Sequence, residues 1–157
     1  HKLNPAGPNH ETIASLAGIA DYFDGLYGHH FSNQSDDFFR RVQAVFEVIA
    51  CHEERLGAEF LDFIAAKPRI HLIGGTDSAA AARVPTFSMQ VKGAHPQELC
   101  KQLAGAGISC GSGHFYAKRL LDSMELEQKE VLRCSMSHFN SRQDVKQLIQ
   151  ALDSLID

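Results

Sequence analysis

The hydrophobic pattern of this 157-residue chain changes its period after Pro68. Before the proline, apolar residues recur at the spacing of an amphipathic helix. After it, short segments alternate between apolar and polar residues, as half-buried strands do, and helical segments separate them. Because the two periods suit different backbones, the chain is expected to begin as helix and to continue as strands and helices.

The part before Pro68 is expected to form two helices separated by a break rich in glycine and histidine. The first helix should run from about residue 11 to 26, and the break should cover residues 25–34. The second should run from about residue 35 to 66, starting at Ser35 and ending before Pro68. Such a helix exceeds the mean length of about 10–14 residues in globular proteins. Helices of this length often connect two domains.

The part after Pro68 is expected to form an α+β fold. Strands are predicted at 69–73, 86–91, 108–110 and 131–136, and helices at 95–106, 115–124 and 141–156. Strands separated by helices that can cover one face of a sheet are typical of this class. We therefore expect a short, mostly antiparallel sheet with helices on one face, preceded by an N-terminal helical arm.

This pattern divides the chain into two parts. Residues 1–34 are expected to form an opening loop and an interface helix, and residues 35–157 an α+β domain that includes the connecting helix 35–66. The sequence begins with His1 and Lys2 and has no initiator methionine. This start fits a piece cut from a longer chain or the remnant of a tag.

The overall composition excludes several classes of partner. The formal net charge is -4, whereas binding to nucleic acid or to an anionic membrane needs a basic surface. No run approaches the roughly 18 apolar residues of a membrane span, and no targeting segment is visible. The four cysteines include no CxxC, and the nine histidines include no HExxH, so no metal site is expected. Free thiols in a reducing cytosol fit this cysteine usage.

Five segments, taken in order along the chain, resemble motifs of a single enzyme family. They are AGPNHETIASLAGIADYF at 6–23, RVPTFS at 83–88, GHFYA at 113–117, LRCSMSHFN at 132–140 and SRQDVKQLIQALDSLI at 141–156. Each motif alone is weak, but five in the expected order are hard to obtain by chance. The chain is thus similar to pyridoxal-phosphate enzymes of the class V aminotransferase family, in the group that resembles cysteine desulfurases and selenocysteine lyases.

This resemblance implies a small C-terminal domain of a fold-type I enzyme that uses pyridoxal 5'-phosphate. A larger N-terminal domain would precede it and carry the lysine of the Schiff base. The parent is expected to be a cytoplasmic homodimer that acts on an amino acid. Cysteine desulfurase or selenocysteine lyase chemistry leads, and transamination is the alternative. The 157 residues alone should have no catalytic residue, no bound cofactor and no turnover, so a non-catalytic interaction module is the alternative of another class.

Arg133 is the residue with the strongest implied role. In the family, the arginine of the matching strand holds the α-carboxylate of the substrate, and a guanidinium can donate two parallel hydrogen bonds to a carboxylate. His114 and Tyr116 are expected to line the mouth of the substrate site. Residue type alone favours a structural arginine at a strand edge, and it fits a surface histidine and a packed tyrosine as well as residues of a substrate mouth.

The loop before the first helix implies a weak contact to the cofactor. Gly7 and Asn9 match a loop whose threonine, in the family, reaches the cofactor phosphate of the neighbouring subunit. That threonine is missing here. Backbone N–H groups of a glycine-containing loop before a helix can bind phosphate, and a plain turn before a helix fits the same residues.

Two features depart from the catalytic pattern of the family. The cysteine that forms a persulfide in one group of desulfurases falls on Tyr116. Cys110 lies earlier in the chain and has no sequence feature of a reactive thiol, and the other three cysteines are expected to serve packing. Lys2 follows a histidine, as the Schiff-base lysine of the family does, but it directly precedes the opening loop. We therefore do not expect Lys2 to be catalytic.

Overall fold

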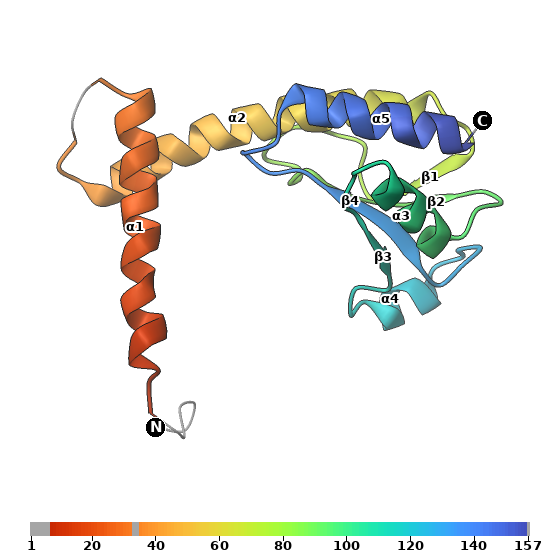
Figure 1. Cartoon of the computed structure of the whole chain (residues 1–157), viewed down its shortest axis with the longest axis horizontal. Coiled ribbons are helices and arrows are strands. Elements are labelled where there is room, and N and C mark those ends of the chain that lie inside the picture. Colours follow the sequence, from red (N-terminus) through yellow and green to blue (C-terminus); the bar gives the residue numbers. More distant parts are fainter. Residues whose placement is uncertain (1–6, 33–34, 157) are drawn as a thin grey trace. The chain divides into compact units, whose positions relative to one another are not determined.

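The computed structural model describes residues 7–32 and 35–156. It contains two compact units, residues 1–49 and 50–157, and each is described by itself. Lys2 lies outside the described residues. The elements are α1 (His10–His30), α2 (Phe38–Ala65), β1 (Ile70–Ile73), β2 (Thr86–Val91), α3 (Pro96–Gly105), β3 (Gly111–Gly113), α4 (Lys118–Ser123), β4 (Val131–Ser135) and α5 (Arg142–Ile156) (Figure 1). The division predicted after residue 34 stays a prediction.

Helix α1 is longer than the sequence predicted. It continues to His30, so the break expected from residue 25 is wrong. Glycine weakens a helix, but the last turn of α1 is held by other contacts. Tyr27 is buried, its ring stacks on Phe31 at a centroid distance of 4.8 Å, and the Phe31 N–H donates to the Tyr27 carbonyl at 2.9 Å. Aromatic packing therefore stabilises the helix beyond Gly25 and Gly28.

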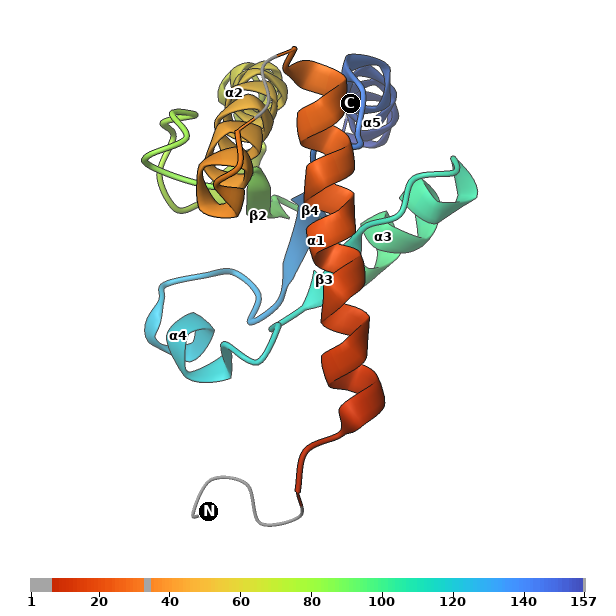
Figure 2. The same cartoon turned by 90° about the vertical axis from the view of Figure 1, so that its left-hand side faces the viewer.

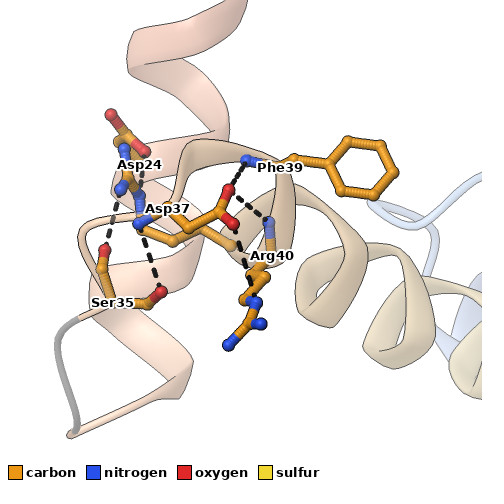
Figure 3. A network of polar contacts seen from close by, with 6 residues as sticks. Asp24, Ser35, Asp37, Phe39 and Arg40 are labelled. Carbon is orange, nitrogen blue, oxygen red and sulfur yellow. Dashed lines mark hydrogen bonds and ion pairs between the residues drawn. The ribbon is translucent and has the colours of Figure 1, made fainter.

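A polar network fixes the start of α2 (Figure 3). Asp37 caps this helix, because its Oδ1 accepts the N–H of Phe39 at 2.9 Å. Arg41 donates from Nε to Asp24 Oδ1 and from Nη1 to the Ser35 carbonyl, both at 2.8 Å. The arginine thus links the last part of α1 to the first turn of α2.

The second unit is built on a four-stranded antiparallel sheet in the order β1-β2-β4-β3. Met89 pairs with Leu132 and Phe87 with Cys134, so these four side chains share one face. All four are buried. The predicted α+β class and the mostly antiparallel sheet are confirmed.

Three helices bury that face of the sheet. Their apolar residues form one core with the strands, contributed by Leu56 and Phe60 of α2, by Leu103 of α3, and by Val145 and Leu152 of α5. Figures 1 and 2 show α2 and α5 on one side of the sheet and the short helix α4 on the other. No helix among the described residues has the length and apolar content needed to cross a membrane.

The strand predicted at residues 108–110 is wrong, because the ladder begins at Gly111. The preceding residues complete the end of α3 instead. Gly107 has φ +79°, and the Ile108 N–H donates to the Leu103 carbonyl at 2.9 Å. This is the left-handed helix end that glycine favours. The backbone N–H of Ile108 is therefore used by the helix and not by the sheet.

Helix α5 begins with a reciprocal capping pair. The Ser141 N–H donates to Asp144 Oδ2 at 2.7 Å, and the Asp144 N–H donates to Ser141 Oγ at 3.2 Å. The hydrogen bond from the Ser141 backbone is the main reason that the pKa of Asp144 lies below its usual value. The ionised carboxylate therefore stabilises the first turn of α5.

We predict that Asp144→Asn lowers the free energy of unfolding at neutral pH and that this difference from the wild type fades in acid. A carboxyl with a lowered folded-state pKa contributes stability above its unfolded pKa of about 3.9, and the contribution is lost as pH falls through the folded pKa. Urea unfolding between pH 3 and 7 measures the difference. Glu125→Gln is the control, because Glu125 is exposed and has no hydrogen bond or ion pair among the described residues. An unchanged difference across this range would contradict the prediction.

Candidate functional site

Arg133 lies on the face of the sheet that the three core helices leave open. It stands on the interior strand β4, where Ser88 of β2 is its neighbour on one side and Gly111 of β3 on the other. Leu132 and Cys134 point into the core, so the side chain between them points the opposite way. The alternation of one strand therefore aims a half-buried cation away from the core.

The guanidinium of Arg133 packs on the ring of Phe115. Its Cζ lies 3.7 Å from the ring centroid, within the range of cation–π attraction. Gly111 makes room for the ring, because an added Cβ there would lie 3.0 and 3.1 Å from two ring atoms of Phe115. Sequence reasoning missed Phe115, and no signal in the sequence marked this contact.

Phe115 reaches this position through a strained turn. Phe115 and Tyr116 have φ values of +46° and +61°, in the left-handed region that residues with side chains seldom occupy. The backbone N–H of Tyr116 donates to His114 Nδ1 at 3.2 Å, and the Ala117 N–H donates to the His114 carbonyl at 2.7 Å. Strain of this kind persists where the surroundings over-determine it.

The three residues predicted for the substrate site therefore belong to one neighbourhood. His114 organises the turn, Tyr116 projects its ring fully into solvent, and Phe115 between them contacts Arg133. His114 and Tyr116, the two residues predicted to line the mouth of the substrate site, flank Phe115, whose ring packs on the guanidinium of Arg133. Their roles toward a substrate stay predictions.

The donors of Arg133 have no partner among the described residues. In the described part of the chain, its guanidinium takes part in no hydrogen bond and no ion pair. Arg83 shows the contrast, since it packs over Phe87 at 4.3 Å but donates to the carbonyls of Gly75 and Thr86 at 2.6 and 2.7 Å. Arg83 ties a loop to β2, whereas Arg133 presents an open fork that fits a carboxylate.

The residues predicted to reach the cofactor phosphate lie in the other unit. Gly7 has φ +74°, and Asn9 caps α1, since its Oδ1 accepts the Thr12 N–H at 2.8 Å. The Asn9 side chain is thus used by its own helix. Backbone N–H groups of the first turn of α1 are the groups left to meet an anion. A phosphate contact at Gly7 and Asn9 stays a prediction.

A second group of reactive side chains lies across the sheet from Arg133. Cys100, Cys110 and Cys134 come together where α3, the start of β3 and β4 meet, and Cys100 Sγ lies 3.4 Å from Cys110 Sγ. All are free thiols. Sequence spacing gave no sign of this cluster, because the register of β3 against β4 creates it. Among the described residues, no group of three or more histidine, cysteine or acidic side chains is arranged to hold a metal ion.

Comparisons with known proteins agree on one family. The sequence model of the family described as Aminotransferase class-V matches residues 39–148. The chain is 34% identical over 159 aligned positions to the aminotransferase-like protein FGM3 of Gibberella zeae. This alignment covers 99% of this chain and 35% of that protein. It is 30% identical over 109 positions to a probable cysteine desulfurase of Pseudomonas aeruginosa, and this alignment covers 69% of this chain and 25% of that protein.

Solved structures agree on the fold. The cysteine desulfurase CsdA of Escherichia coli superimposes with a TM-score of 0.55 at 20% identity, over 81% of this chain and 33% of that one. A cysteine desulfurase of Thermococcus onnurineus superimposes with a TM-score of 0.59 at 19% identity, over 76% and 30%. The chain thus spans about a third of the length of these proteins, and its fold corresponds to part of a fold-type I domain.

We predict that Gly111→Ala displaces the Phe115 ring from Arg133. The new methyl group would lie 3.0 and 3.1 Å from two ring atoms, so the ring has to move by a few tenths of an ångström, and overpacking of a well-packed site costs about 1–3 kcal/mol. The side-chain protons of Arg133, shielded by the ring in the wild type, should move downfield in NMR spectra. Gly105→Ala is the matched control, because its Cβ would meet nothing within 4 Å. Arg133 resonances that stay in place in Gly111→Ala would show that the ring does not hold the guanidinium.

Proposed function

Because this chain belongs to the class V aminotransferase family, we propose that it is the C-terminal part of a pyridoxal-phosphate enzyme that acts on an amino acid. The single observation that carries the proposal is the open guanidinium fork of Arg133. A cation that is half-buried, packed on an aromatic ring and without a carboxylate partner among the described residues is suited to bind an anionic ligand. The α-carboxylate is the anion that every amino-acid substrate carries.

Arg133 would bind and orient the substrate. Two parallel N–H donors of the guanidinium would hold the two carboxylate oxygens, which fixes the plane of the carboxylate as well as its position. Phe115 would restrict the guanidinium to this orientation, since its ring covers one face of the fork. His114 and Tyr116 would line the mouth, and the exposed Tyr116 ring would be the first group that an incoming substrate meets.

We infer that the Schiff-base lysine and most of the cofactor site lie outside this chain. Among the lysines near the turn at Phe115, Lys118 pairs with Asp122 at 2.9 Å and Lys129 donates to the Met124 carbonyl at 2.8 Å. Pyridoxal phosphate supplies an electron sink for charge at the substrate α-carbon when it is bound. The lysine for it would come from a larger N-terminal domain. No chemical step is therefore assigned to the residues of this chain.

The length of the match supports such a larger domain. The chain covers 35% of its fungal relative and 33% of CsdA. In a homodimer of the whole protein, the first turn of α1 with Gly7 and Asn9 would approach the cofactor phosphate of the other subunit through backbone N–H groups. We propose both the larger domain and the homodimer as parts of the functional enzyme.

Cysteine desulfurase or selenocysteine lyase chemistry is the leading reaction, because the bacterial relative and both solved structures are named as cysteine desulfurases and the sequence motifs resemble both enzymes. Transamination is the second candidate. It is favoured by the name of the fungal relative and by the exposed Tyr116 in the turn where one group of desulfurases has its cysteine. In the first case the whole protein should convert cysteine or selenocysteine to alanine and pass the sulfur or selenium atom to an acceptor thiol, from which an added dithiol releases it as sulfide or selenide and becomes a disulfide itself. In the second case it should pass the amino group to a 2-oxo acid.

A non-catalytic interaction module is the candidate of a different class. One observation favours it: Ile13, Leu16, Ile19 and Tyr22 of α1 are 53, 56, 54 and 48% exposed. They recur every third residue, a spacing that drifts by about 60° a step on an α-helix, so they form a stripe that winds around the helix surface. An apolar stripe of this kind is typical of a helix that packs on another protein surface. In the enzyme this surface would belong to the larger domain or to the second subunit.

We predict that Arg133→Ala raises KM for the amino-acid substrate of the whole protein by about 10–100-fold, because hydrogen bonds to charged groups contribute about 1.5–3 kcal/mol. Arg133→Lys should restore part of the loss, since an amine keeps the charge but not the two parallel donors. Steady-state kinetics at several substrate concentrations would measure both.

Arg119→Ala is the matched control, because Arg119 is exposed on α4 and makes no hydrogen bond or ion pair among the described residues. A substrate analogue that keeps the amino group but lacks the carboxylate should bind equally well to the wild type and to Arg133→Ala. A KM that does not change in Arg133→Ala, with circular dichroism showing an intact fold, would sink the carboxylate assignment.

A further inference from the structure

Three of the four cysteines converge on the core side of the sheet. Cys134 of β4 is buried in the core. Cys110 directly precedes β3, the strand paired with β4, and it packs against the same core. Cys100 reaches this face from α3, which packs against β3 and β4. The three thiols therefore come from three different elements that the fold holds together.

The sulfur atoms are within contact distance. Cys100 Sγ lies 3.4 Å from Cys110 Sγ, and the Cys100 thiol donates to the Cys110 carbonyl at 3.2 Å. Cys100 and Cys110 are half-buried, whereas Cys134 is only 2% exposed. A disulfide needs a sulfur separation of about 2.05 Å. The two sulfurs would have to approach each other by about 1.4 Å to form one. Both residues of the close pair are therefore partly exposed, in contrast to Cys134.

The neighbours of Cys110 favour its ionised form. A hydrogen bond from the Cys134 thiol holds the pKa of Cys110 below its usual range against the opposing effect of burial, and the contact with Cys100 adds to the lowering. The same contact with Cys110 raises the pKa of Cys134, and burial raises that of Cys100. Any negative charge in the cluster is therefore placed on Cys110. The thiolate is the reactive form of cysteine.

We propose that Cys110 and Cys100 form a redox-active dithiol that a hydroperoxide oxidises reversibly to a disulfide, with Cys134 as the buried hydrogen-bond donor to Cys110. This site is on the opposite face of the sheet from Arg133 and uses none of the residues assigned to the substrate. It therefore goes beyond the proposed enzymatic function and does not depend on it.

The oxidation proceeds in two balanced steps. The Cys110 thiolate attacks one oxygen of the hydroperoxide, an S–O bond forms, the O–O bond breaks, and sulfur gives up two electrons to leave a sulfenic acid and a hydroxide or alkoxide. Cys100 sulfur then attacks Cys110 sulfur. An S–S bond forms, the S–O bond breaks, and the Cys100 proton leaves with the hydroxyl group as water. An external dithiol reverses the reaction by exchange and becomes a disulfide itself.

The test treats the full 157-residue chain with a small excess of hydrogen peroxide at pH 7 and maps every cysteine by mass spectrometry. We expect a disulfide between Cys100 and Cys110 that dithiothreitol reverses. Cys51 is an internal control, since it is exposed and outside the cluster, and it should stay a thiol while the disulfide forms. In Cys100→Ser, the sulfenic acid should persist on Cys110 and be captured by dimedone.

A matched pair of variants tests the hydrogen-bond donor. Cys134→Ser keeps an O–H donor and should keep fast oxidation, whereas Cys134→Ala removes the donor and should slow it by about three- to tenfold. The gain is smaller than the change in ionised fraction, because nucleophilicity falls together with pKa. If Cys134→Ala does not fold, the serine variant and Cys100→Ser still decide the question. Oxidation of Cys51 before Cys110, a bridge from Cys110 to Cys134, or no dimedone adduct on Cys110 in Cys100→Ser would each overturn the proposal.

Discussion

Strand β4 is paired on both sides, with β2 and with β3, and its register is fixed by what its side chains bury. Leu132 and Cys134 pack into the core, and Arg133 between them faces the open side. A shift of β4 by one residue would move its core-facing side chains to the open face and its open-face side chains into the core, because side chains along a strand alternate between the two faces. It would place a guanidinium among apolar helices, where an unpaired charge is strongly unfavourable. The core therefore sets the position of the one cation that the proposed function needs.

The same register also determines what supports that cation. Gly111 lies opposite Arg133, and only a residue without a side chain leaves room there for the Phe115 ring. The ring reaches this space through two consecutive left-handed residues, a backbone arrangement that costs free energy. The contact between ring and guanidinium offsets part of this cost. The strained turn and the oriented arginine thus stabilise each other.

Much of the fold follows from the sequence, because the change of period at Pro68 separates helix from sheet and the α+β class is confirmed. Two errors have a common cause. Stacking of Tyr27 on Phe31 stabilises the last turn of α1 beyond its glycines. The backbone N–H of Ile108 bonds to the end of α3 and not to the sheet. In both places contacts that local preference does not include decide the structure. The alternation around Arg133 could be predicted. The Phe115 contact and the thiol cluster could not, because both arise from pairing between β3 and β4.

The faces of the sheet also bear on the sulfur chemistry of the family. A substrate carboxylate held by Arg133 would lie on the open face, whereas Cys110 and Cys134 belong to the core face and Cys100 to the helix that covers it. Cys51 lies on α2, a helix on that same side of the sheet. No cysteine of this chain therefore faces the place where the substrate would be bound. For Cys134 to face that place, β4 would have to change register, which the core opposes. Sulfur from a substrate held by Arg133 would therefore have to be accepted by a thiol outside these residues. Transamination would need no thiol.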